Sequence, residues 1–274
     1  MIKSDYSILT ILAAYALFIW LQDLNWISSL EDTLPILLAL PVFIWIGWPW
    51  DFDLNSRPFP FQALFLALLG FIAGLLVNSI ALLSFSWTMA LWGWLSTRLP
   101  SERLKETKRL LILPFMAFPW LILEGDIIGW WFRLSGAWTA ELFFTTIGYN
   151  VIHEGTLIMI DNLPVGIDAA CSGLNALQSM LIAGSVIAVL QLGDRSGFWL
   201  GILFLFLLAW VANTLRIISI CLLGLLISPD YAQGVFHTWG GWLVLVIMFC
   251  LSWFFLGLMR AGFKSPLVEH EVYQ

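Results

Sequence analysis

The chain has 274 residues, of which 61% are hydrophobic and only 11% are charged, and its mean hydropathy is +0.91. A soluble domain of this length does not have such a composition. The formal net charge of −6, without a strongly basic patch, argues against a nucleic-acid-binding module. We therefore predict an all-α, polytopic membrane protein that forms one membrane-embedded domain over residues 1–274.

Apolar runs of about 20 residues predict membrane-spanning helices, because the hydrocarbon layer is about 30 Å thick and a helix rises about 1.5 Å per residue. Only Asn78 and Ser79 separate the third run from the fourth, so one long kinked element is an alternative there. The N-terminal run has no small-residue cleavage site, which favours a retained span over a signal peptide. The eight predicted spans are 6–22, 33–50, 59–77, 80–97, 108–124, 173–192, 198–227 and 241–260.

The loop Arg98–Arg109 predicts the orientation of the chain, because basic residues concentrate in cytoplasmic loops. It carries five lysines and arginines, so it is expected in the cytoplasm. Alternation from this loop places both termini in the cytoplasm and the segment 125–172 outside, and the other basic loops agree. The expected location is the cytoplasmic membrane, with any site near 125–172 facing the extracytoplasmic side.

The segment 125–172 is the only sizeable part predicted to lie outside the membrane. Its first part mixes aromatic and polar residues, which predicts one or two helices at the membrane interface. The sequence NVIHEGTLIMI is rich in β-branched residues and is broken by His-Glu-Gly, Asn162–Pro164 indicates a turn, and VGIDAAC indicates a second short strand. We expect a small hairpin that leads to Cys171 at the start of the sixth span.

Cys171 lies in DAACSGLNALQSM, at the predicted N-terminus of a helix. The positive end of a helix dipole and free backbone N–H groups stabilise a thiolate, which makes such a cysteine nucleophilic. Gly173 would let a substrate backbone approach closely. The alternative is a small buried residue in a tight helix start. The other two cysteines, Cys221 and Cys250, lie in apolar runs and are expected to be packing residues rather than disulfide partners.

Arg216 is a cation in the middle of an apolar run, in the sequence NTLR. A charge in the hydrocarbon region costs several kcal/mol, and such residues usually serve a function. Asn213 lies three residues earlier, on the same helix face. The alternative for Arg216 is a structural residue that hydrogen-bonds carbonyl groups.

His237 lies in GVFHTWGG, before the eighth span and on the same predicted side as Cys171. Imidazole is the usual general acid or base near neutral pH. An ordinary interfacial histidine is the alternative, and His153 and His270 are weaker candidates. A nucleophilic cysteine, an imidazole and a fixed cation together suit acyl transfer from a peptide bond. No motif predicts a metal site or a cofactor.

These motifs, taken in order, resemble the exosortase/archaeosortase family of membrane-embedded, sortase-like transpeptidases. The resemblance rests on ACSG at Ala170–Gly173, NTLR at Asn213–Arg216 and His237 before the last span, within residues 150–260. It implies Cys171 as the nucleophile, with Arg216 and His237 as catalytic partners. Ser172, Gly173 and Asn213 are then candidate substrate contacts.

The resemblance also implies the substrates of this chain. They are exported proteins with a C-terminal signal made of a short motif, of which Pro-Glu-Pro is the best known, a membrane span and a basic cluster. Cleavage is expected at the outer face of the membrane, followed by transfer to a surface acceptor.

Two other classes of function remain open from the residues alone. In a transporter or channel, Arg216 would bind an anion in a central pathway formed by discontinuous helices. Asn78 and Gln178 are the main uncharged polar side chains in the spans that would support it. In a non-catalytic scaffold of a polysaccharide or secretion complex, Cys171, Arg216 and His237 would not lie close together.

Overall fold

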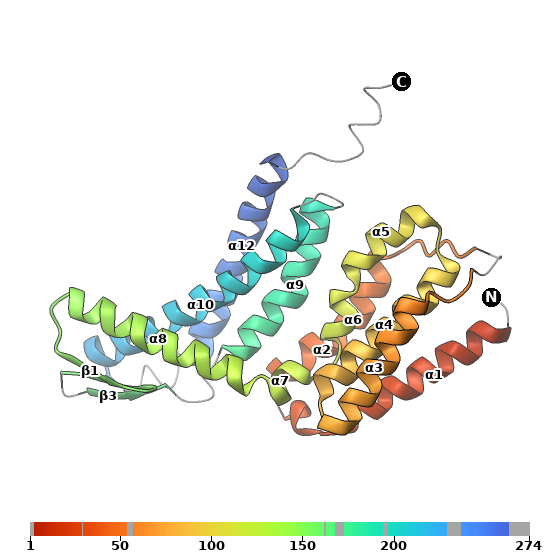
Figure 1. Cartoon of the computed structure of the whole chain (residues 1–274). Coiled ribbons are helices and arrows are strands. Elements are labelled where there is room, and N and C mark those ends of the chain that lie inside the picture. Colours follow the sequence, from red (N-terminus) through yellow and green to blue (C-terminus); the bar gives the residue numbers. More distant parts are fainter. Residues whose placement is uncertain are drawn as a thin grey trace. The chain divides into compact units, whose positions relative to one another are not determined.

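A computed structural model describes the backbone of most of the chain, and its contacts divide the chain into two compact units, Met1–Gly125 and Asp126–Gln274 (Figure 1). Helices make up most of the described residues, as expected. The described ranges are 3–28, 30–53, 57–161, 163–167, 173–193, 197–228 and 237–262.

The first unit contains helices that match the first four predicted spans closely. They are separate elements, because Asn78 adopts the left-handed conformation with φ of 55° and ends α3. Ser79 then caps the next helix by accepting a hydrogen bond from the Leu82 N–H. The helices are α1 (Lys3–Trp20), the 3-10 helix η1 (Asn25–Ile27), α2 (Leu30–Ile46), α3 (Phe61–Val77) and α4 (Ile80–Arg98).

The predicted span 108–124 is wrong, because the chain there does not form one helix. Three shorter helices cover this part of the sequence: α5 (Ser101–Leu110), α6 (Ile112–Met116) and α7 (Trp120–Glu124). Two prolines interrupt the apolar run, since proline lacks the N–H that a helix interior needs. Pro114 lies in α6 and Pro119 directly precedes α7.

Polar contacts fix the helices of the first unit at both ends of α4. At its C-terminal end, the Arg98 guanidinium lies 2.8 Å from the buried carboxylate of Asp5 in α1. At its N-terminal end, the Glu124 carboxylate accepts hydrogen bonds from the Ser79 hydroxyl at 2.9 Å and from the backbone N–H groups of Ile80 and Ala81. A carboxylate is stabilised there by the helix dipole and satisfies free N–H groups.

The second unit contains helices at the positions of the remaining three predicted spans and the only strands in the described residues. By length and apolar composition, two of the described helices could cross a membrane, at Phe198–Leu226 and Leu243–Gly262, and shorter apolar helices accompany them. The helix limits agree with the predicted spans 173–192, 198–227 and 241–260 within a few residues. The elements are α8 (Asp126–Thr146), β1 (Val151–Glu154), β2 (Leu157–Ile160), β3 (Leu163–Gly166), α9 (Leu174–Leu192), α10 (Phe198–Leu226) and α12 (His237–Gly262).

The predicted hairpin is instead a three-stranded antiparallel sheet in the order β1-β2-β3. NVIHEGTLIMI does not form one strand, because Gly155 turns the chain with φ of 61° and separates β1 from β2. Pro164 lies inside β3 rather than in a turn, opposite Met159. The Ile167 N–H donates a hydrogen bond to the Thr156 carbonyl. Because hydrogen-bonded and non-hydrogen-bonded pairs alternate along an antiparallel ladder, the odd-numbered residues of β3 hydrogen-bond to β2. Pro164 is at an even position, where no N–H is needed.

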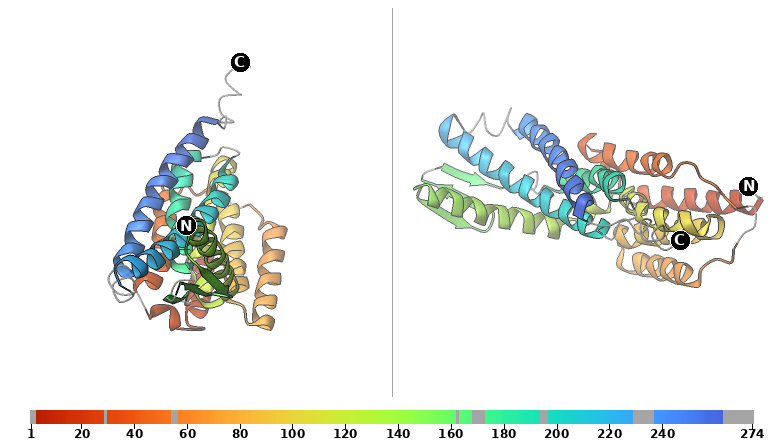
Figure 2. Two further views of the ribbon diagram at one scale, coloured as in Figure 1. Left: turned by 90° about the vertical axis from the view of Figure 1, so that its left-hand side faces the viewer. Right: turned by 90° about the horizontal axis from the view of Figure 1, so that it is seen from above.

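One face of the sheet packs against α8 and α10, as Figure 1 and Figure 2 show. The shared core includes Phe144 from α8, Ile158 and Ile160 from β2, and Ile217 from α10. At the edge of the sheet, His153 Nδ1 in β1 lies 3.2 Å from the Glu141 carboxylate in α8. The contact gives this weaker candidate histidine a structural partner.

Candidate active site

A close approach between the N-cap of α9 and α10 brings two of the predicted motifs together. Gly173 precedes α9 with φ of +74°, and a Cβ atom placed on it would lie 2.6 Å from Asn213 Cγ and 2.8 Å from its Oδ1. Only glycine fits here, because it adopts positive φ without strain and leaves room for the amide of Asn213. The glycine of ACSG therefore meets the asparagine of NTLR directly before the start of α9.

Further glycine contacts fix the register of the two helices. A Cβ on Gly184 of α9 would lie 2.7 Å from the Leu205 side chain, and one on Gly201 of α10 would lie 2.8 Å from that of Leu192. These contacts pair ascending positions of α9 with descending positions of α10, so the helices are antiparallel. The short segment between them is consistent with this arrangement.

Arg216 extends the face of α10 that packs against α9. At about 100° per residue it lies about 20° around the helix from Leu205 and about 60° from Asn213, both of which contact α9. It is one turn past Asn213, so its Cα lies about 4.5 Å beyond the level of Gly173. The partly buried side chain of Arg216 thus belongs to the end of the unit where the ACSG motif enters α9.

His237 reaches the same level by an independent count. A Cβ on Gly257 of α12 would lie 3.9 Å from Gln191 Oε1 of α9, and the two helices run in the same direction (Figure 1). Counting back equal numbers of residues from this contact aligns Leu174, the first residue of α9, with position 240 of α12. The first residue of α12, His237, is then about 4.5 Å beyond the start of α9.

The predicted site is therefore described in part. Gly173 and Asn213 are in contact, and Asn213 is only 2% exposed. The backbones of Arg216 and His237 both lie beyond the N-terminal end of α9. Cys171 and Ser172 lie outside the described residues, as does the side chain of His237, so the distances among the three predicted catalytic groups stay predictions.

Two buried polar side chains near this end were not assigned to the site from the sequence. Gln178 in α9 is 2% exposed, and within the described part of the chain neither its Oε1 nor its Nε2 has a hydrogen-bond partner. Thr214 in α10 is 5% exposed, and its hydroxyl lacks such a partner too. The sequence signal for Gln178 was a glutamine inside an apolar run. The burial of its side chain depends on tertiary packing and could not be predicted from that run.

The other two cysteines differ in their surroundings. Cys221 is buried in the core between α10 and the sheet, as predicted. Cys250 is exposed on α12, so its prediction as a packing residue is wrong, because α12 buries only one of its faces. Among the described residues, no group of three or more histidine, cysteine or acidic side chains is placed to hold a metal ion.

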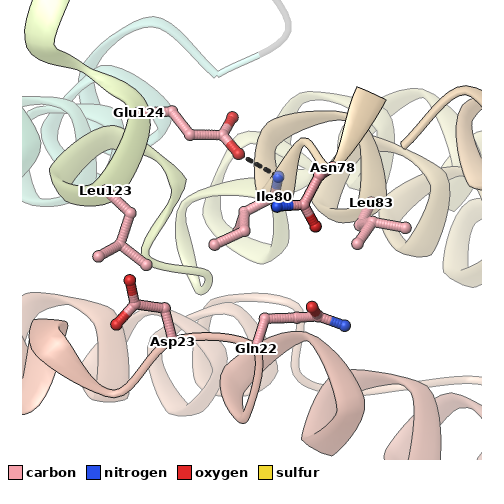
Figure 3. A pocket seen from close by; sticks show the side chains of 7 residues that line it. All are labelled: Gln22, Asp23, Asn78, Ile80, Leu83, Leu123 and Glu124. Atoms are coloured by element: carbon pink, nitrogen blue, oxygen red, sulfur yellow. Dashed lines mark hydrogen bonds between the residues drawn. The ribbon is translucent and has the colours of Figure 1, made fainter. Parts of the chain in front are cut away.

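A pocket of about 210 Å³ lies in the first unit, at the turn between α3 and α4. Figure 3 shows the carboxylates of Asp23 and Glu124 on opposite sides of it, with Asn78 on the side of Glu124. Glu124 already serves as the cap of α4, and Asp23 accepts a hydrogen bond from the Asn25 N–H at 2.8 Å. The polar lining of this pocket thus serves local helix ends and contains none of the predicted catalytic residues.

The comparison with known families decides the identity of the chain. The model of the transmembrane exosortase family matches residues 26–254, which include all three motifs. The chain belongs to the transmembrane exosortase family. Neither the curated proteins nor the solved structures contain a match to it. As an exosortase, it is a membrane protein with a sortase-like role in processing exported proteins that carry sorting signals.

Proposed function

We propose that this exosortase is a cysteine transpeptidase that cleaves C-terminal sorting signals of exported proteins at the outer face of the cytoplasmic membrane. Cys171 is the nucleophile, Arg216 binds the oxyanion or positions the peptide, and His237 transfers protons. The observation that carries the proposal is the contact between Gly173 and Asn213. It ties the cysteine motif to the arginine motif at one end of α9.

Chain connectivity and helix registers support this assignment. Cys171 is two residues from Gly173, so their Cα atoms are at most about 7 Å apart. The backbones of Arg216 and His237 lie about 4.5 Å beyond the N-terminal end of α9, the end that Cys171 precedes in the sequence. Long arginine side chains span such distances readily. The same helices give no support to a transporter, because α10 is continuous for 29 residues through Arg216.

The proposed reaction begins when the Cys171 thiolate attacks the carbonyl carbon of the scissile peptide bond and forms a tetrahedral oxyanion. The guanidinium of Arg216 offers fixed N–H donors to this oxyanion. Protonated His237 gives its proton to the leaving amine as the C–N bond breaks, which leaves a thioester on Cys171. An incoming amine or water then attacks the thioester, transfers its proton to His237 and regenerates the thiolate.

Gly173 and Ser172 are proposed to line the path of the substrate backbone. Asn213 holds Gly173 in place, so it contributes to the geometry of the site as well as being a candidate substrate contact. The acceptor is a group on the cell surface that supplies the incoming nucleophile.

The test is processing of an exported reporter that carries a C-terminal sorting signal from the same genome, in a strain that lacks the native enzyme. Cys171→Ala should abolish cleavage at an unchanged protein level. Cys250→Ala is the matched control, because Cys250 is exposed on α12 away from the motifs, and it should process normally. Continued cleavage by Cys171→Ala would show that the nucleophile is another residue.

A further inference from the structure

The Gln178 side chain is a buried amide whose donor and acceptor are both unused within the described residues. Its 2% exposure leaves no contact with bulk solvent. A buried polar group without a partner destabilises the fold, and native proteins retain few of them. Ser185, a buried polar residue further along α9, bonds the Leu181 carbonyl. Gln178 therefore carries an energetic cost that packing of the resting protein does not explain.

The position of Gln178 relates it to the proposed site. It lies five residues after Gly173, about 7.5 Å further along α9 from its N-terminal end. An extended peptide advances about 3.3 Å per residue, so a chain that runs along α9 from the level of Gly173 reaches Gln178 within two to three residues. These would be the residues on the C-terminal side of the scissile bond.

That part of the substrate carries main-chain N–H and carbonyl groups with which the Gln178 amide can form hydrogen bonds. Directly after the recognition motif, the membrane span of the sorting signal begins, and the first turn of a helix has N–H groups without internal partners. Inside a membrane such groups must be satisfied by protein. The Oε1 of Gln178 accepts from an N–H, and its Nε2 donates to a carbonyl oxygen. One glutamine can thus satisfy two main-chain groups at the point where the substrate changes from extended to helical.

Both α10 and α12 pack against α9. Only 17% of the α12 span is buried, against 44% of α10, and Leu243 near the His237 end is 59% exposed. The exposed face of α12 is therefore open to a membrane-spanning substrate segment.

We propose that Gln178 binds the main chain of the substrate's membrane-spanning signal segment, just after the scissile bond. The proposal rests on the proposed function for the identity of the substrate. It assigns Gln178 a role in substrate binding and not in bond cleavage.

The experiment uses the full-length enzyme and measures capture separately from cleavage. In a Cys171→Ala background, the sorting-signal reporter is co-purified with the enzyme, and in the Cys171 background its cleavage rate is measured. Gln178→Leu keeps the size of the side chain and removes both hydrogen-bonding groups. Gln191→Leu is the matched control, because Gln191 is the other buried glutamine of α9 and lies at the opposite end.

Gln178→Leu is expected to weaken capture and slow cleavage by about tenfold, which is the loss expected for one to two hydrogen bonds. Its thermal stability in detergent should stay the same or rise, because the leucine removes buried polar groups without partners. Gln191→Leu should capture and cleave normally. Normal capture by Gln178→Leu would overturn the proposal. A fall in its thermal stability would also overturn it, since the amide would then serve the resting fold. Capture without cleavage by the enzyme that retains Cys171 would refute the cysteine mechanism and leave the test of Gln178 intact.

Discussion

Replacing Gly173 by alanine tests whether the contact between the two motifs sets the rate of processing. The added Cβ would lie 2.6 Å from Asn213 Cγ, whereas ordinary contacts begin at 3.4 Å, so the start of α9 must move by roughly 0.8 Å from α10. Alanine at φ of +74° also carries a strain of about 1–2 kcal/mol. A displacement of about 1 Å between catalytic groups can cost about 100-fold in rate.

We therefore expect Gly173→Ala to lower the processing rate by about 100-fold and the stability by about 1–3 kcal/mol. Pulse-chase labelling of the reporter gives the rate, and thermal unfolding in detergent gives the stability. Substitutions at two other glycines separate the effect of backbone strain from the effect of the steric contact. Gly155→Ala has the positive φ of 61° but no atom within 4 Å of the new Cβ, and Gly184→Ala meets Leu205 at 2.7 Å without positive φ. A normal rate for Gly173→Ala, or an equal loss for Gly155→Ala, would refute the reasoning.

Three further predictions concern charged groups. Arg216→Lys should reduce processing by about 100-fold at normal expression, because lysine lacks the planar array of donors; a rate near that of the wild type would remove Arg216 from the oxyanion site. Asp5→Asn should lower the free energy of unfolding by about 3–5 kcal/mol, because it leaves the buried guanidinium of Arg98 without its carboxylate, and replacing both residues by leucine should restore most of the loss. Glu124→Ala should cost about 1–2 kcal/mol, measured by thermal unfolding, while Glu124→Asp should retain part of the cap.

Long apolar runs predicted helices at seven of the eight positions, and two of these helices are long and apolar enough to cross a membrane. The prediction failed at 108–124 because it relied on hydropathy alone. Pro114 and Pro119 are local signals against a continuous helix in this segment. The third strand was missed for a related reason. Pro164 was assigned to a turn, but it fits an edge strand at a position where no N–H is needed.

The candidate site was predictable where residue chemistry is unusual and not where it depends on packing. An arginine in an apolar run and the glycine of ACSG stand out in the sequence, and the structure places Gly173 against Asn213 in the same motif as Arg216. Gln178 was visible as a polar residue, but only the fold shows that its amide is buried without a partner. The pairing of each glycine with a side chain on the neighbouring helix depends on the register between the helices, and hydropathy gives no information about that register.

The glycine contacts between α9 and α10 also bear on the order in which the protein assembles. They join residues that are close in sequence, so the pair can form as a helical hairpin as soon as α10 leaves the ribosome. The meeting of Gly173 with Asn213 needs no residue of α12. Half of the proposed catalytic geometry would thus be set during synthesis, and the proposed enzyme would stay inactive until α12 is inserted with His237.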